Sequence, residues 1–511
     1  MYYWGFLLSQ YCLSYSKVYK NISAQAESLN RKSFLLMTFQ NRPYMNPYIN
    51  RLIVLLLQVL LVSCAVTKDY QKPTIEYPSH FSTAESEGGD TVIMHRKEFF
   101  KNEKLLQLID HAMEKNSTVQ LALLNVESAG AILKKVKLNY LPELDAKISG
   151  NRSEASKNSL AGISAQEFTS STVTQDFTAF FGLTWEIDIW GKIKRQKEAV
   201  FSEYLQTQEV QKAVQTRLVA NVAMGYYNLL MLDSQLAVAK RNIQLGKNTV
   251  EILQIQYKYG DSNSFGVLQA TAQLEEVKVI QLQIEQAIAQ QEVALSILCG
   301  YFPSPIERQE QTNSELNSLR MDYDVALLAN RPDVFASELN LRAANASVGV
   351  AQASLYPTLS LSAQGGLNSL KVSNWFTVPA SLFSSVAGGV TQPVFNRGRL
   401  KLQEKQAKID YEKAVIDFRQ TVLDAYGEVS IALMNVEKLN EQAKHNKLRE
   451  LALRQGIETA KTLFKNGMVN YLEVITAENN YLQASLASAV LRREQLSNRI
   501  ELYRAIGGGW N

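Results

Sequence analysis

The chain has 511 residues, of which 53 are basic and 49 acidic, giving a formal net charge of +4. These charges are scattered without a basic run that could bind a phosphate backbone, so nucleic acid is not expected as a partner. Three cysteines and four histidines show no metal-ligand or catalytic spacing, so we predict neither a metal site nor an enzyme. No stretch offers the roughly 18 to 20 apolar residues of a spanning helix, so a membrane crossing would require strands.

An apolar segment begins after Arg51 and ends in Leu61-Val62-Ser63-Cys64. A basic residue followed by about 11 apolar positions is typical of an export signal. The ending resembles a bacterial lipobox, which implies that Cys64 becomes the mature N-terminus and carries diacylglycerol and an N-acyl chain. Ala65 after it suits release to the outer membrane. The alternative, a buried cysteine beside a core strand, is disfavoured by the polar residues 67–70.

The segment before this signal is longer than an export signal needs. We therefore interpret residues 1–63 as an N-terminal extension plus signal peptide, with translation starting at Met37 or Met45. Residues 64–98 then form a lipidated linker.

The rest of the chain is a tandem duplication of one unit. Trp190-Gly191-Lys192-Ile193 recurs as Arg397-Gly398-Arg399-Leu400, and 267–270 recurs as 474–477, both 207 positions later. Internal repetition at a fixed offset indicates a duplicated unit. We predict a first repeat at 99–302, a connector at 303–330 and a second repeat at 331–511.

Each repeat contains a long stretch without proline, 143–302 in the first and 394–511 in the second. Good helix formers fill most of both stretches, so we predict helices at 194–259, 265–299, 401–466 and 471–506. A helix of about 65 residues runs roughly 100 Å, too long for a compact globule.

The helix at 265–299 carries a coiled-coil repeat in which apolar and glutamine positions alternate spacings of three and four residues. These positions are Leu274, Val277, Gln281, Ile284, Ile288, Gln291, Leu295 and Leu298. An ordinary helical hairpin in a soluble bundle is the alternative. These eight positions form the seam along which the helix packs, and its glutamines favour a wide ring of helices whose inner side faces water.

Before each long helix the period changes to two, the period of a strand. We predict strands at 144–151, 177–189, 358–365 and 385–395, paired through polar loops at 153–172 and 368–384. Their length and aromatic ends suit transmembrane strands, and a small soluble β-domain is the alternative. Four strands cannot close a barrel, and an open edge in lipid is forbidden, so the chain must oligomerise.

Several segments together resemble the TolC-type outer-membrane efflux proteins, in particular the lipoproteins that serve resistance-nodulation-division pumps. They are 185–192 (Trp-Glu-Ile-Asp-Ile-Trp-Gly-Lys), 329–334 (Ala-Asn-Arg-Pro-Asp-Val) and 356–359 (Tyr-Pro-Thr-Leu). The resemblance implies a mainly α chain with membrane β-strands. Three such chains would close one 12-stranded β-barrel and a periplasmic α-helical barrel.

The resemblance also implies a function and partners. The chain would be a lipid-anchored outer-membrane channel subunit of a tripartite efflux pump, exporting small molecules such as drugs, detergents or metal ions. A homotrimer would dock on a periplasmic membrane-fusion adaptor and an inner-membrane resistance-nodulation-division pump. A type I protein-secretion conduit and a non-pore surface coiled-coil scaffold are the alternatives.

The two helical turns are the candidate functional sites, because the family places its periplasmic tip there. The adaptor-contact candidates are Gly260, Asp261, Ser264, Gly467, Asn470 and Tyr471. The glycines suit left-handed C-caps, and Ser264 and Asn470 suit N-caps. Glu473 and Thr476 are the pore-constriction candidates, because Glu473 aligns with an acidic gate position of the family. A three-fold ring of Glu473 would favour cations.

Overall fold

The computed structural model describes residues 68–73, 81, 95–260, 263–309, 323 and 325–510. It divides into two units, Met1–Cys64 and Ala65–Asn511, and all the described residues belong to the second. The proposed signal, both candidate start methionines and Cys64 lie outside the described residues.

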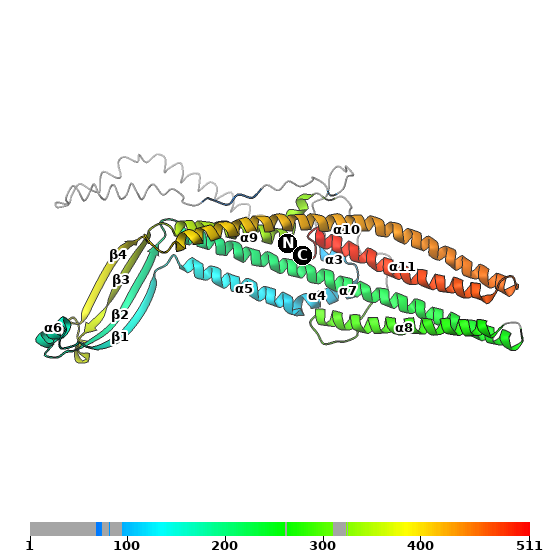
Figure 1. Cartoon of the computed structure of the whole chain (residues 1–511), viewed down its shortest axis with the longest axis horizontal. Helices are drawn as coiled ribbons and strands as arrows, with labels where there is room; N and C mark the ends of the chain where they lie inside the picture. Colours follow the sequence, from blue (N-terminus) through cyan, green and yellow to red (C-terminus); the bar gives the residue numbers. More distant parts are fainter. Residues whose placement is uncertain are drawn as a thin grey trace, which may run out of the picture. The chain divides into compact units, whose positions relative to one another are not determined.

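The second unit contains the following elements (Figure 1): α3 (Arg96–Phe99), α4 (Glu103–Lys115), α5 (Ser117–Leu138), β1 (Glu143–Glu154), α6 (Leu160–Thr169), β2 (Val173–Ile187), α7 (Lys192–Lys258), α8 (Ser264–Leu298), η1 (Val325–Asn330), α9 (Pro332–Ala353), β3 (Thr358–Ser369), η2 (Val372–Asn374), β4 (Leu382–Thr391), α10 (Arg399–Lys465) and α11 (Tyr471–Ala505).

The duplication is visible in the helix lengths. α7 and α10 each have 67 residues, α8 and α11 each have 35, and the paired helices begin 207 positions apart. All four predicted helices are confirmed, with ends within two residues of the predicted ones. At 1.5 Å per residue, α7 and α10 are each about 100 Å long.

Each long helix packs against the helix that follows it, α8 along α7 and α11 along α10. The predicted seam of α8 is confirmed, since none of its eight positions is exposed. Polar pairs interrupt it: the Asn228 amide donates to Gln291 Oε1 at 2.9 Å. In the second hairpin, Glu450 accepts hydrogen bonds from Ser485 and Ser488 at 3.1 and 2.8 Å.

The four strands form one antiparallel sheet in the order β1-β2-β3-β4. Several predicted bounds need correction: β1 extends to Glu154, β2 begins at Val173, and β3 extends to Ser369. The predicted fourth strand at 385–395 lies instead at Leu382–Thr391, because the ladder ends where Thr358 pairs with Thr391, and Pro393 has no N–H to continue it. The predicted loop at 153–172 contains the helix α6.

Tryptophans make hydrogen bonds where strands meet helices, and Trp190 links the two copies. The Trp185 indole N–H donates to the Tyr140 carbonyl at 3.0 Å, and the Trp190 N–H donates to the Pro357 carbonyl at 2.7 Å. Trp190 also stacks on Tyr356. These contacts fix the sheet onto the helices. Within the described ranges, no helix combines the length and the apolar character that a membrane crossing demands.

Candidate functional site

The two hairpin turns lie at the end of α7 and α10 remote from the sheet (Figure 1). Gly260 and Gly467 have φ of +82° and +70°, and a Cβ at either position would meet nothing within 4 Å. The left-handed backbone alone therefore explains these glycines. The predicted glycine C-caps are confirmed.

The returning helices are both capped by asparagine. Asn470 accepts a hydrogen bond from the Leu472 N–H at 2.9 Å, as predicted, and Asn263 accepts one from the Gly266 N–H at 3.0 Å. The prediction that Ser264 is an N-cap is wrong, because it is the first helical residue of α8. The 207-residue offset between Asn263 and Asn470 was the signal that could have found the true cap. Asp261 lies outside the described residues.

Tyr471 joins the two hairpins close to these turns. Its hydroxyl donates to Thr249 Oγ1 on α7 at 2.7 Å, and its ring meets Phe464 edge-to-face at 4.8 Å between centroids. Burial raises the pKa of Tyr471 to about 12. Beneath it, Leu253, Ala270 and Ile475 form a small apolar cluster drawn from α7, α8 and α11.

A cavity of about 580 Å³ lies between the two turns. It is lined by Gln256, Asn263, Phe265, Gly266, Gln269, Phe464, Lys465, Gly467, Val469, Asn470, Tyr471, Leu472 and Ile475. The lining mixes amide side chains with aromatic and aliphatic ones and one lysine, and its described residues include no carboxylate. In the described part of the chain, no cluster of histidine, cysteine or carboxylate side chains could hold a metal ion.

Glu473 lies on the first turn of α11 and Thr476 about one turn further along, and both are exposed. The Thr476 hydroxyl donates to the Leu472 carbonyl at 2.8 Å, so it is directed along its own helix. Glu473 has no ion-pair partner among the described residues. In the first copy Gly266 and Gln269 occupy the equivalent positions, so each chain offers one carboxylate there.

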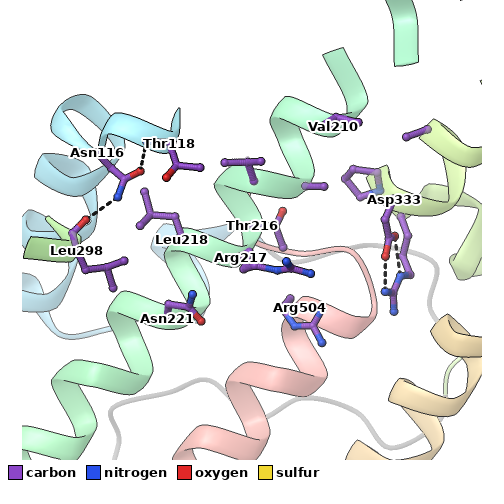
Figure 2. A pocket seen from close by; sticks show the side chains of 15 residues that line it. Asn116, Thr118, Val210, Thr216, Arg217, Leu218, Asn221, Leu298, Asp333 and Arg504 are labelled. Carbon is purple, nitrogen blue, oxygen red and sulfur yellow. Dashed lines mark hydrogen bonds and ion pairs between the residues drawn. The ribbon is translucent and has the colours of Figure 1, made fainter. Parts of the chain in front are cut away.

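A second cavity, of about 510 Å³, lies midway along the helices, bordered by α5, α7, α9 and α11. Figure 2 shows Asn116 on one side and Asp333 on the other, with Arg217 and Arg504 between them. Next to it Arg331, 4% exposed, pairs with Asp333 at 2.6 Å and Glu428 at 2.8 Å. Its guanidinium also donates to the Ala505 carbonyl at 2.9 Å.

This arrangement explains the 329–334 motif as structural. Burial disfavours the ionised form of Asp333, but Arg331 and the Val334 N–H more than offset this and hold its pKa below its usual value. Arg331 connects the beginning of α9 to α10 and to the end of α11. The motif therefore holds α9, α10 and α11 of the second repeat together.

Sequence reasoning missed the contacts of the linker. Asp69 pairs with Arg195, a side chain that is 5% exposed, at 2.7 Å, and Lys72 pairs with the buried Glu338 at 2.6 Å. Tyr70 lies against the Arg342 guanidinium. Burial disfavours ionised Glu338, yet Lys72 and Arg342 hold its pKa below the usual value. Ion pairs between residues more than 100 positions apart leave no signal in local periodicity.

Comparisons with known proteins agree with this geometry. The family model described as outer membrane efflux protein matches residues 108–301 and again 325–508. The cation efflux system protein CusC of Escherichia coli O157:H7 is 28% identical over 88% of this chain and 96% of its own length. The probable outer membrane lipoprotein SilC of Salmonella typhimurium is 26% identical over 88% and 97%.

A crystal structure of CusC superposes with a TM-score of 0.80 at 27% identity, covering 87% of this chain and all of that one. The predicted fold class, outer-membrane location and efflux-channel role are confirmed by these matches. The chain belongs to the outer membrane efflux protein family.

Proposed function

We propose that three copies of this chain form one passive outer-membrane conduit, which works with a membrane-fusion adaptor and a resistance-nodulation-division pump to export small molecules. The observation that carries this proposal is the sheet. Its outer strands β1 and β4 have no further strand partner within the described residues, and it sits at one end of helices about 100 Å long. A strand edge cannot stay unpaired in lipid, so neighbouring copies must pair with it.

The helical hairpins supply the periplasmic part of the conduit. Their seams contain amide and hydroxyl pairs, which suit helices that border water on one side. The six turn residues Gly260, Asp261, Ser264, Gly467, Asn470 and Tyr471 are the proposed adaptor contacts, and Glu473 and Thr476 the proposed constriction. Export is driven by the pump, and the conduit itself performs no reaction and needs no cofactor.

The lipid anchor at Cys64 is part of the proposal, and the described linker supports it. Asp69 is bound to Arg195 at the start of α7, next to the strand–helix junction. Five residues span at most about 18 Å, so acyl chains on Cys64 can reach a bilayer that surrounds the strands. Mass spectrometry of the mature chain should find an acylated Cys64 at its N-terminus. A chain that starts at an unmodified Met1 would refute the anchor.

The proposed boundaries are 1–63 for the extension and signal, 64–98 for the linker, 99–302 and 331–511 for the repeats, and 303–330 for the connector. Planar-bilayer recording of the purified full-length chain tests the function. We expect stable conductance steps of one main size. A folded chain that inserts but never conducts would favour a scaffold without a pore.

A further inference from the structure

Basic side chains gather where the long helices meet the sheet. Windows 131–138, 191–200 and 396–405 together hold eleven basic and two acidic residues, although the whole chain is nearly balanced, with 53 and 49. α5 ends, and α7 and α10 begin, at this same junction (Figure 1). The excess of positive charge is therefore local to one level of the molecule.

Nine of these side chains are exposed and form no ion pair with any described residue. We call them the basic junction surface: Lys134, Lys135, Lys137, Lys194, Lys197, Arg397, Arg399, Lys401 and Lys405. The other two are paired, Lys192 with Glu186 and Arg195 with Asp69 and Glu198. The charge of the nine residues of the basic junction surface is therefore not balanced by any ion pair in the described chain.

Helix stability explains only part of this surface. The lysines of α5 lie in its last turns, where the helix dipole favours cations. Those of α7 and α10 lie in or beside the first turns, where the dipole disfavours cations, and neither first turn contains an acidic residue. At α7 the Asp188 carboxylate, which accepts from the Lys194 N–H at 2.9 Å, offsets part of this, whereas α10 has no side-chain cap, so an external anion would compensate the remaining charge.

Two carboxylates at the end of the second strand region are already engaged: Glu186 pairs with Lys192 at 2.9 Å, and Asp188 accepts a hydrogen bond from the Lys194 N–H at 2.9 Å. Glu186 and Asp188 of the second strand region fall on its polar face, opposite the apolar face of Phe181 and Trp185. In a sheet closed by neighbouring copies, the polar face borders the interior and the apolar face borders lipid. These acids therefore lie on the polar face and are already engaged, so they leave the nine exposed basic side chains uncompensated.

We propose that the basic junction surface binds the headgroups of anionic phospholipids in the leaflet that faces the periplasm. The inference rests on the proposed outer-membrane function, because that function places the junction at the bilayer surface. Each basic side chain near an anionic bilayer is attracted to the lipid headgroups, and salt weakens this attraction. The surface would hold the channel at a fixed depth and concentrate anionic lipid around it.

The test uses Trp185 and Trp190, which lie at this junction, as reporters. The full-length chain is reconstituted in phosphatidylcholine vesicles containing brominated phosphatidylglycerol or brominated phosphatidylcholine, and tryptophan quenching gives the relative association of the two lipids. We expect phosphatidylglycerol to be preferred roughly fivefold at low salt, and the preference to disappear at high salt.

The variant Lys194→Gln, Lys197→Gln, Lys401→Gln, Lys405→Gln should lose the preference. Its matched control replaces four exposed lysines by glutamine, Lys240, Lys247, Lys444 and Lys447, which lie about 70 Å along α7 and α10 from the junction. Equal quenching by both lipids at low salt would overturn the inference, as would a control that loses the preference equally.

Conductance of the same preparations separates two kinds of failure. A conducting channel without lipid preference contradicts only the lipid surface. A chain that neither conducts nor is quenched by either brominated lipid contradicts the outer-membrane function itself. If the junction variant fails to insert, the salt dependence of the native chain decides, and a preference unaffected by salt overturns the inference.

Discussion

Tyr471 and Glu473 occupy neighbouring positions at the start of α11 but have opposite surroundings. Tyr471 is half-buried and bonded to α7, whereas Glu473 is exposed. The first therefore holds the hairpins together, and the second is free to meet ions. Sequence alone identified both residues but not the Thr249 contact, because a hydrogen bond between residues 222 positions apart depends on how the two copies pack.

Tyr471→Phe should lower the free energy of unfolding by about 0.5–1.5 kcal/mol, because it deletes one hydrogen bond and leaves Thr249 unsatisfied. The folded-state pKa is raised from 10.0 to about 12, so this tyrosine's contribution is full below pH 10 and is lost as pH rises towards 12. Thermal unfolding between pH 8 and 12 measures both effects, with Tyr257→Phe, which is exposed, as control. Identical alkaline profiles for native chain and Tyr471→Phe would contradict this role.

Glu473→Gln should reduce the preference of the pore for cations. A charge interaction of about 1 kcal/mol corresponds to roughly a fivefold change in permeability ratio. Reversal potentials in a salt gradient measure the ratio, and Glu412→Gln on α10, also exposed, is the matched control. Unchanged selectivity in Glu473→Gln would remove Glu473 from the constriction.

At the scale of elements, the long helices were predictable and the sheet less so. Proline-free stretches and a fixed repeat offset located all four helix ends, because backbone breakers and caps are local signals. The last strand was misplaced by a few residues, since its bounds depend on pairing with β3. The helix α6 was missed because its polar surroundings are typical of a loop.

Arg331 tests how the elements are joined. Arg331→Met should destabilise the chain by about 1–3 kcal/mol, because Asp333 loses its cation, Glu428 keeps only Arg504, and the Ala505 carbonyl loses its donor. Thermal unfolding measures this loss. Arg454→Met, an exposed arginine on α10, should change the unfolding temperature little. If the two substitutions lowered the unfolding temperature equally, the contacts of Arg331 would have no special role in joining the helices.

At the scale of the whole molecule, two copies of one unit give two long hairpins and a sheet whose outer strands have no further partner among the described residues. The sequence periodicity indicated that the strands of a single chain could not close a barrel. In the structure, the described strands form one open four-stranded sheet. The number of copies does not follow from one chain's periodicity. It is the central claim of the trimeric conduit.

The most direct measurement is a disulfide scan between the free edges. Ser149→Cys on β1 is combined in one chain with a cysteine at 385, 387 or 389 on β4. Within a chain these strands are about 14 Å apart, beyond the reach of about 7 Å between Cα atoms, so any disulfide must join neighbours. Oxidised membranes should contain a covalent ring of three chains that still conducts. A chain that remains monomeric with all three pairs, or links into dimers only, would contradict the account.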